Sequence, residues 1–430
     1  MGRVEGATAA TPIDFIYFDP EHTDYHPGHI RIFAERADAD PRIASMHFVL
    51  SPGLAHNDHA GVLDTIRAGR KLTLEFCSEE VMRVSSPDGG LSSRRRGKVR
   101  WNEARRLLTL RPGAVMYDTP FDNTLAAAAL DRRPLPGRLT GTVFSCAPAL
   151  LSPSIVTRFK LRAKYLLARR RDIPVVFTFD QVFVEQGPRA IVANWKAAPD
   201  PLPLSHAQFQ RLITAPPALA KDRVEFLLFG AIAPHKGIAE VLQALGALSP
   251  EIAAKTRVRF LGRCSEGGSD ARAKFLDHIA QTRAATAAEI VFDERFASED
   301  ELIDAMIGCD AMIATRRHHE GVSHNLIWAA AAGRPIISQN SSWMGHITTH
   351  ERLGLVCDPL DPEAIAAAMT QIIDPQWRAS FPTSGPRAFA AAHTADGYYE
   401  TIVTTLAGPR PGAYPGAHPG AYPGALAAVT

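Results

Sequence analysis

The sequence predicts an α/β protein of two domains, each built on a doubly wound parallel sheet. Short segments rich in apolar, β-branched and aromatic residues alternate along most of the chain with longer segments of helical periodicity. This alternation is typical of parallel strands covered by helices. A chain of 430 residues is too long for one ordinary core and fits two domains of nearly equal size.

The first half opens with a strand over residues 13–18, which runs into Asp19-Pro20, a loop containing glycine and a helix from residue 30. That order is the opening unit of a doubly wound sheet, in which ligands bind at the carboxyl ends of the strands. Further strands are expected at 47–50, 72–76, 114–117, 142–144 and 175–178. Helices are expected at 30–37, 60–68, 101–108 and 154–168.

A proline-rich passage over residues 192–203 marks a change of domain, so we expect a first domain over 1–195 and a second over 196–392. Strands of the second domain are expected at 224–229, 258–261, 290–292, 311–314, 336–338 and 354–356. Its helices are expected at 238–248, 270–283, 299–308 and 362–373. A terminal helix follows within 393–407. The Pro/Gly repeat within 408–430 cannot form a packed core and is expected to be disordered.

Composition narrows the class of protein. Hydrophobic residues make up 46% and charged residues 21%, as in ordinary globular proteins, and a net charge of +2 argues against a dedicated nucleic-acid binder. Five scattered cysteines form no C-x-x-C pair, which indicates reduced thiols. The sequence shows no secretory signal pattern and no apolar run long enough to span a bilayer. We therefore expect a cytoplasmic protein.

The most informative stretch is residues 313–338, which predicts a strand, a polar loop, a short buried helix and a second strand. Glu320 and Gly321 lie in the loop, just before a helix that starts near Ser323. A helix N-terminus offers unpaired N–H groups and partial positive charge to an anion. A carboxylate beside such an anion-binding helix N-terminus suits a ligand that carries both phosphates and hydroxyls.

This stretch resembles the E-G-x-S-x-x-L-x-E-A-x-A-x-G-x-P signature of retaining two-domain glycosyltransferases, the E-x7-E or glycosyl transferases group 1 family. The matching residues are Glu320, Gly321, Ser323, Leu326, Ala329, Ala331, Gly333 and Pro335. The resemblance implies the GT-B architecture, in which two Rossmann-like domains face a cleft and a terminal helix crosses back to the first domain. It also implies a nucleotide-sugar donor in the second domain, contact of Glu320 with the donor sugar, and no required metal or cofactor.

A second loop carries the cation that such a donor requires. The segment 229–237, FGAIAPHKG, follows the first strand of the second domain and resembles the family's G-R-I-x-P-x-K-G loop. Lys236 would hold the diphosphate, and Gly230 and Gly237 would leave room for it. With Gly321, Val322 and Ser323 these residues form the expected donor site. The arginine positions of the family are Ala231 and Ala233 here.

Trp328 stands where the family has its second glutamate, which holds the ribose. An indole offers one donor and no acceptor, so it does not replace a carboxylate that accepts two hydroxyl hydrogen bonds. Trp328 either packs in the core or stacks on the donor. This departure, with Ala231 and Ala233, leaves open a non-catalytic partner in a polysaccharide assembly complex as an alternative to a hexosyltransferase. A sugar-nucleotide epimerase on the same two-domain fold is a second alternative.

In the first domain, the loop after the first strand is crowded with His22, Asp24, His26 and His29, but their spacing follows no strict metal-ligand pattern. By the resemblance, Gly28 stands nearest to a glycine loop that faces donor and acceptor, and His26 or His29 would bind the acceptor. Asp118 follows another strand, in a region where family members often carry a histidine that lines the cleft.

Two basic clusters, within residues 94–106 and 158–171, indicate peripheral contact with an anionic membrane surface. The expected partners are a nucleotide-sugar donor and a sugar or lipid-linked sugar acceptor, without nucleic acid. The resemblance implies transfer of a hexose-type sugar to a hydroxyl with retention, in the synthesis of a cell-surface polysaccharide or glycolipid.

Overall fold

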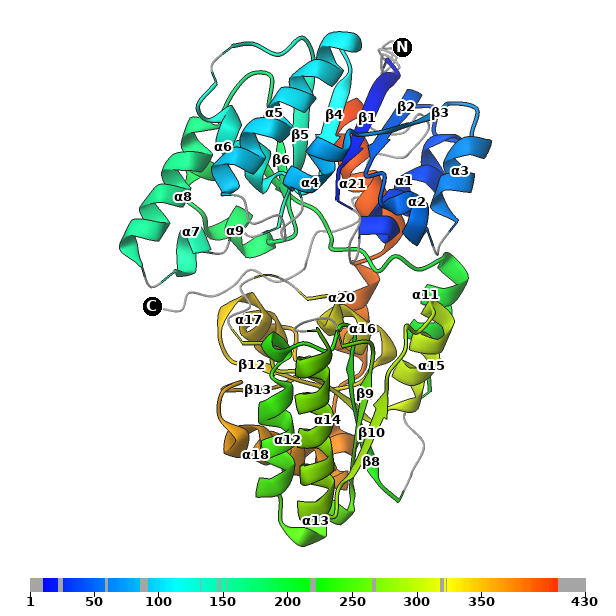
Figure 1. Cartoon of the computed structure of the whole chain (residues 1–430), viewed down its shortest axis with the longest axis vertical. Helices are drawn as coiled ribbons and strands as arrows, with labels where there is room; N and C mark the ends of the chain where they lie inside the picture. Colours follow the sequence, from blue (N-terminus) through cyan, green and yellow to red (C-terminus); the bar gives the residue numbers. More distant parts are fainter. Residues whose placement is uncertain are drawn as a thin grey trace, which may run out of the picture. The chain divides into compact units, whose positions relative to one another are not determined.

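The computed structural model of the protein describes residues 11–21, 26–58, 61–85, 92–131, 133–144, 146, 148–152, 154–216, 222–264, 268–317, 321 and 323–408. The chain forms two compact units (Figure 1). The first domain comprises Met1–Pro203 with Ala395–Thr430, and the second comprises Leu204–Thr394. The boundary at 195/196 expected from sequence falls within a strand of the first domain, Trp195–Ala197.

The first domain contains a seven-stranded parallel sheet in the order β3-β2-β1-β4-β5-β6-β7. The strands are β1 (Ile13–Asp19), β2 (Ile43–Leu50), β3 (Leu72–Phe76), β4 (Val115–Asp118), β5 (Arg138–Val143), β6 (Val176–Thr178) and β7 (Trp195–Ala197). The central strand β1 pairs with β2 on one side and β4 on the other, with Phe18 opposite Asp118. Asp19 and Asp118 therefore end neighbouring strands at the carboxyl edge of this sheet.

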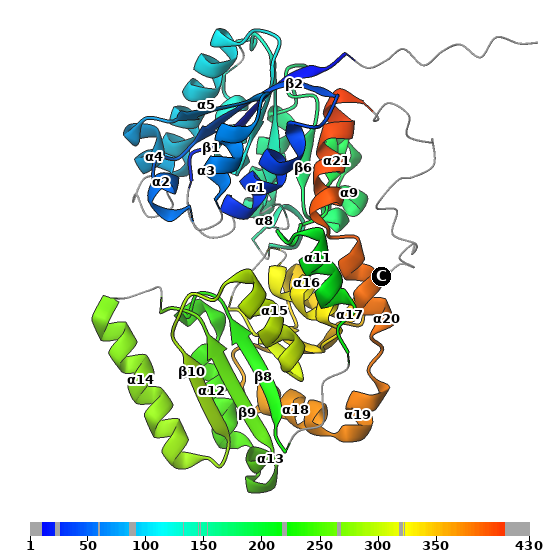
Figure 2. The same cartoon turned by 90° about the vertical axis from the view of Figure 1, so that its right-hand side faces the viewer.

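Helices cover both faces of this sheet and bury two apolar clusters (Figure 2). They are α1 (His26–Ala37), α2 (Leu54–Asn57), α3 (Val62–Ala68), α4 (Glu79–Ser85), α5 (Ser93–Leu110), α6 (Asp122–Ala128), α7 (Pro148–Leu151), α8 (Ile155–Leu167), α9 (Gln181–Gln186), α10 (Arg189–Val192) and the C-terminal α21 (Ala395–Ala407). Tyr398 and Ile402 of α21 belong to the same core cluster as Phe33 of α1, and the Tyr398 hydroxyl lies 2.7 Å from that of Tyr117. The terminal helix is thus part of the first domain.

The second domain contains a six-stranded parallel sheet in the order β10-β9-β8-β11-β12-β13. The strands are β8 (Val224–Phe229), β9 (Thr256–Leu261), β10 (Glu289–Asp293), β11 (Ala311–Ala314), β12 (Ile336–Gln339) and β13 (Gly354–Cys357). The helices are α11 (His206–Ile213), η2 (Pro234–Lys236), α12 (Ile238–Ala247), α13 (Pro250–Ala254), α14 (Gly268–Ala285), α15 (Glu299–Gly308), α16 (His324–Ala332), α17 (Ser342–His350), α18 (Pro362–Ile373), α19 (Pro375–Ser380) and α20 (Ser384–Ala391).

The predicted fold class is confirmed, since both sheets are parallel and covered by helices. Several local predictions differ from the structure; α5, for example, begins at Ser93 and not at residue 101, and β5 at Arg138 and not at residue 142. The first helix begins at His26 and not at residue 30, so His26, Gly28 and His29 stand on a helix where a loop was expected. The three-residue strand β7 was missed, because it lies in the proline-rich passage taken for a linker. Among the described residues, no helix is long and apolar enough to cross a membrane.

Candidate active site

The second sheet has a topological switch point between β8 and β11. The chain leaves β8 towards β9 and β10 on one side, whereas β11, β12 and β13 extend the sheet on the other. The loops that follow β8 and β11 therefore flank the crevice in which ligands usually bind in an open α/β sheet, at its carboxyl edge. The two loops predicted to bind the donor are these two loops.

Lys236 lies at the end of η2 in the loop after β8, and its side chain turns back towards the end of that strand. The side chain is buried, and Nζ donates a hydrogen bond to the carbonyl of Phe229 at 3.3 Å. Gly230 has φ +92°, and a Cβ there would stand 3.1 Å from Lys236 Nζ. The glycine thus supplies both the backbone conformation and the space that bring the ammonium to the strand end.

Three contacts join the β8 loop to the β11 loop. The backbone N–H of Arg317 donates to the carbonyl of His235 at 2.9 Å. Gly237 has φ +72°, and a Cβ on it would lie 2.1 Å from the carbonyl oxygen of Thr315, so only glycine permits this approach. The guanidinium of Arg317 forms an ion pair with Glu240, which is buried in the first turn of α12. These contacts fix Lys236 relative to the end of β11.

The loop after β11 leads to the N-terminus of α16. Ser323 is the N-cap, and its hydroxyl accepts a hydrogen bond from the backbone N–H of Asn325 at 3.4 Å. Gly321 is half-buried just before the cap. Glu320 and Val322, the other predicted donor-site residues of this loop, lie outside the described residues. The structure therefore brings Lys236, Gly230, Gly237, Gly321 and Ser323 to one edge of the sheet.

Trp328 is part of the apolar core at this end of the sheet. Its side chain is 5% exposed and packs edge-on against Phe229, the last residue of β8, with ring centroids 6.2 Å apart. The other residues from Leu326 to Ala332 are fully buried, so α16 lies tightly against the sheet. Of the two roles predicted for Trp328, the structure supports core packing.

The first domain carries a buried network of ionisable groups at its own switch point, between β1 and β4. His26 Nδ1 lies 2.7 Å from Asp19 Oδ2, and its Nε2 lies 3.6 Å from Glu21 Oε2. Arg100 of α5 contacts Glu21 at 3.2 Å and forms an ion pair with Asp118. The network thus links two residues predicted on the acceptor side, His26 and Asp118.

Within this network, burial and neighbouring charges shift the pKa values of the ionisable groups in opposite directions. Burial raises the pKa of the Asp118 carboxyl and that of Glu21, and the Arg100 guanidinium offsets part of each rise. For His26, burial is the largest single influence and disfavours the charged form, but the carboxylates of Asp19 and Glu21 together outweigh it and the pKa of the imidazole is raised. The three groups therefore hold protons more readily than they would in water.

The prediction missed Asp19, Glu21 and Arg100 as members of this network. Arg100 was assigned to a basic surface cluster, which is wrong for this residue because its side chain is completely buried. A buried arginine cannot be recognised from one basic run, although its position on the apolar face of α5, one residue before buried Trp101, was a weak signal. Asp19-Pro20-Glu21 directly after the first strand was a stronger one.

The remaining acceptor-side residues pack within the first domain. His29 is buried on α1, with its ring 5.4 Å from that of Tyr398 and 5.9 Å from that of Phe179. Gly28 lies in the first turn of α1, where a Cβ would come within 2.6 Å of Pro203. These contacts give both residues a structural reason to be there, and their role towards an acceptor stays a prediction.

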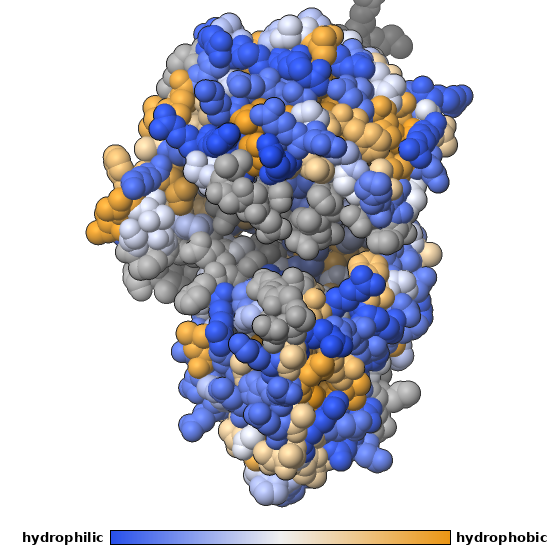
Figure 3. Space-filling model, in the orientation of Figure 1, coloured by the Kyte–Doolittle hydropathy of each residue, from blue (hydrophilic) through white to orange (hydrophobic). Residues whose placement is uncertain are grey.

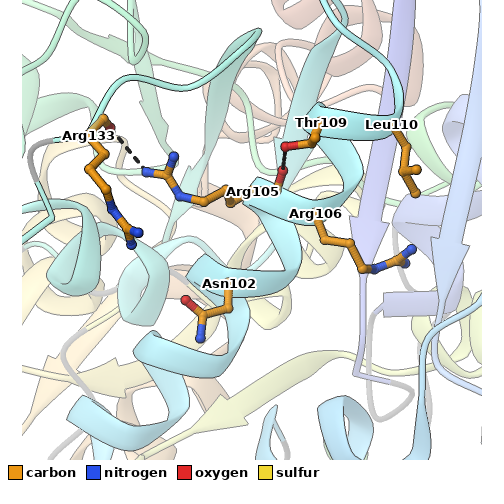
Figure 4. Close-up of a pocket in the computed structure, with 6 residues that line it drawn as sticks. All are labelled: Asn102, Arg105, Arg106, Thr109, Leu110 and Arg133. Carbon is orange, nitrogen blue, oxygen red and sulfur yellow. Dashed lines mark hydrogen bonds between the residues drawn. The ribbon is translucent and has the colours of Figure 1, made fainter.

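A shallow hollow on the outer surface of α5 is a poor candidate for the site (Figure 4). It is lined by Asn102, Arg105, Arg106, Thr109, Leu110 and Arg133. Its guanidinium groups are all paired with carboxylates, Arg105 and Arg133 with Asp131, and Arg106 with Glu75 and Glu103. It also lies by the end of α5 that leads into the start of β4, opposite the strand ends where ligands bind.

Comparison with known proteins agrees with this geometry. Residues 210–381 match the family model described as glycosyl transferases group 1. This range contains both loops of the second-domain crevice. No curated protein matches the sequence.

Three solved structures represent those with the same fold. Anabaena Alr3699/HepE, solved with UDP-glucose, has 14% identity and a TM-score of 0.60, with 92% of this chain and 99% of that chain covered. The UDP-forming α,α-trehalose-phosphate synthase of Burkholderia vietnamiensis has 10% identity and a TM-score of 0.65, covering 91% and 99%. The lipopolysaccharide outer core galactosyltransferase WaaB has 12% identity and a TM-score of 0.58, also covering 91% and 99%.

At these identities the structural likeness establishes the fold alone, and the family model covers less than half of the chain. Residues 210–381, most of the second domain, therefore match the glycosyl transferases group 1 family, and the chain as a whole has the two-domain GT-B fold.

Proposed function

We propose that this protein transfers a hexose-type sugar from a UDP-sugar to a hydroxyl acceptor, with retention of configuration at the anomeric carbon. The observation that carries the proposal is the placement of Lys236 at the switch point of the second sheet, in a loop joined to the one that leads into α16. A uridine donor is favoured because the solved relatives include one with UDP-glucose bound and one that is described as UDP-forming.

In this proposal the diphosphate is bound by charge and by backbone N–H groups together. The Lys236 ammonium neutralises one phosphate, and the N-terminus of α16, capped by Ser323, receives the other. Gly230, Gly237 and Gly321 allow the donor to approach the backbone, and Val322 belongs to the same donor-binding loop. Glu320 accepts hydrogen bonds from hydroxyls of the sugar.

Retention follows if the acceptor reacts on the face from which the nucleotide leaves. The acceptor oxygen forms the new bond to the anomeric carbon as the bond to the phosphate oxygen breaks, and the acceptor proton passes to that departing phosphate oxygen. Negative charge grows on the diphosphate during this step. Lys236 and the α16 N-terminus then stabilise the transition state more than the ground state.

The acceptor is proposed to bind at the strand ends of the first domain, near Asp118, His26, His29 and Gly28. The carboxylates of this region suit the hydroxyls of a sugar, because each oxygen accepts hydrogen bonds. We propose a sugar or lipid-linked sugar as acceptor, in the synthesis of a cell-surface polysaccharide or glycolipid, with the protein cytoplasmic and peripheral on the membrane.

One observation favours a second candidate, a non-catalytic glycosyltransferase-like partner in such an assembly. Trp328 fills the position of a ribose-binding glutamate with a buried indole, and Ala231 and Ala233 stand at positions where the family carries arginine. The donor site then lacks several charge-assisted hydrogen bonds, each worth about 1.5–3 kcal/mol.

A donor-hydrolysis screen over UDP-, GDP- and ADP-sugars distinguishes these functions. We expect slow release of UDP by the wild-type protein, and its loss in Glu320→Ala and in Lys236→Ala. With an acceptor, NMR of the product should show the anomeric configuration of the donor. Turnover that survives both substitutions would overturn the site. Absence of donor binding in calorimetry with the same sugars would favour the scaffold, and interconversion of the intact donor without release of nucleotide or need of an acceptor would indicate an epimerase.

A further inference from the structure

The helix α8 presents the most conspicuous apolar surface among the described residues. The exposed fractions of Ile155, Val156 and Phe159 are 72%, 60% and 73%, and Leu166 and Leu167 are nearly half exposed. Tyr165 is the only fully buried residue of the helix. Figure 3 shows apolar surface at the edge of the first domain where Figure 1 places α8. Ordinary surface helices expose polar residues on this side.

The spacing of these residues makes one face of α8 apolar and its two borders basic. Ile155, Phe159 and Leu166 follow one another at four and seven residues, so they line one side of the helix. By the same geometry Arg158 and Arg162 lie along one border of that side and Lys160 along the other, whereas Lys164 lies opposite it. Tyr165 lies about a quarter turn from that side and points into the protein, where it packs on Phe183 and Trp195.

The basic groups at these borders remain available to an anionic surface. Neither Arg158 nor Lys160 forms an ion pair with any of the described residues. Arg162 donates only to a backbone carbonyl, that of Ala149 at 2.8 Å. The Lys164 ammonium lies 4.7 Å from the centre of the Tyr165 ring and is partly buried, so it contributes less.

The other basic cluster of the sequence, on α5, has neither the available charges nor the apolar side of α8. Arg100 is buried, and Arg105 and Arg106 are paired with carboxylates. Arg94 and Arg95 are exposed, but no large apolar side chain is exposed along the part of α5 before Leu110. α5 therefore offers charge without an apolar face.

We propose that α8 is a membrane-docking helix, which lies in the headgroup plane of an anionic lipid surface with Ile155, Phe159 and Leu166 inserted among the acyl chains. An apolar side bordered by lysine and arginine matches that surface, since the charges stay at the phosphates while the apolar groups leave water. The inference deepens the membrane setting of the proposed function, but it concerns binding and not catalysis.

Vesicle flotation of the full chain tests the proposal. Wild-type protein should float with vesicles of phosphatidylcholine and phosphatidylglycerol, and should bind phosphatidylcholine alone much more weakly. The double variant Ile155→Ser/Phe159→Ser should lose about tenfold or more in partitioning, because two inserted side chains are removed. The double variant Arg158→Glu/Lys160→Glu should lose on the order of a hundredfold, since each basic group near such a surface contributes about fivefold.

Two variants of the same kind elsewhere in the first domain serve as controls. Leu110→Ser/Leu130→Ser removes two leucines that are 65% and 68% exposed, and Arg94→Glu/Arg95→Glu reverses the same number of charges on α5. Both should bind anionic vesicles within about twofold of wild type. The proposal would be overturned if the α8 variants and the control variants lost vesicle binding equally. It would also be overturned if the wild-type protein did not bind anionic vesicles.

Self-association is the other outcome that would overturn it. Light scattering in the absence of lipid should give the same mass for the wild type and for Ile155→Ser/Phe159→Ser. A wild-type oligomer that this variant converts to a monomer would assign the face to a second copy of the chain. Calorimetric titration of UDP into each variant separates the two proposals, because α8 variants should bind UDP like the wild type whether or not they bind vesicles.

Discussion

The substitution Gly237→Ala probes the junction on which the donor site depends. Gly237 has φ +72°, and the added methyl group would start 2.1 Å from the carbonyl oxygen of Thr315, where carbon and oxygen need more than 3.0 Å. The two loops must therefore part by roughly 1 Å. The left-handed backbone costs a non-glycine residue about 1–2 kcal/mol, and the overpacking a further 1–3 kcal/mol.

Separation of the two loops in Gly237→Ala should weaken donor binding as well as lower the free energy of unfolding. Lys236 precedes Gly237, and the hydrogen bond from Arg317 to His235 lies beside it, so the ammonium moves with the loop. A displacement near 1 Å at a positioned group costs up to about a hundredfold in function. We expect the free energy of unfolding to fall by about 2–5 kcal/mol, and UDP affinity to fall by about tenfold or more.

Gly61→Ala is the matched control for strain alone. Gly61 has φ +64°, and a Cβ there meets nothing within 4 Å. Urea unfolding of the full chain should show a loss of only about 1–2 kcal/mol for this variant, and calorimetry should show wild-type UDP affinity. If the two variants proved alike in both measurements, the close approach of the two loops would have no functional meaning and the reasoning would fail.

Three further predictions concern the core and the buried network. Trp328→Ala should lower the free energy of unfolding by about 3–5 kcal/mol and Trp328→Phe by much less, in urea titrations, because the ring fills space against Phe229; similar losses would contradict a packing role. Arg100→Leu should cost about 3–5 kcal/mol by leaving Asp118 and Glu21 buried without their cation, and addition of Asp118→Asn should restore part of it; a stable Arg100→Leu variant would refute the coupling. Burial lowers the pKa of His26, but the carboxylates of Asp19 and Glu21 together raise it above its ordinary value. The stability that the protonated imidazole contributes should therefore be complete below about pH 6.5 and lost as pH rises through the folded-state pKa. The free energies of unfolding of the wild type and Asp19→Asn, measured by urea titration and plotted against pH across this range, should have different slopes. Equal slopes would contradict a stabilising interaction between His26 and Asp19.

Much of the fold could be predicted because it depends on local patterns. The strands of the second sheet are continuous apolar runs such as residues 224–229 and 336–338, and short glycine or proline segments separate them from amphipathic helices. Buried parallel strands require such runs. β7 was missed because its three residues have no pattern of their own and are held by pairing with β6.

The donor loops could be predicted for a different reason. Gly230, Lys236 and Gly237 are close in sequence, and their strand-end position follows from the strand before them. The buried network could not be predicted from the sequence, because Arg100 contacts Glu21 and Asp118 only after three separate segments have packed together. Likewise, the burial of Trp328 depends on its contact with Phe229, which no spacing along the chain reveals.

The most direct test of the central claim is calorimetric titration of UDP-glucose into the wild-type chain and Lys236→Ala, with Lys255→Ala as control. Lys255 is an exposed lysine of the same domain, paired with Glu251 at 2.7 Å. We expect the wild type and Lys255→Ala to bind alike. Lys236→Ala should bind more weakly by about tenfold to a hundredfold, the value of one lost charge-assisted hydrogen bond. Equal affinity of all three proteins would show that the crevice between β8 and β11 does not hold the diphosphate.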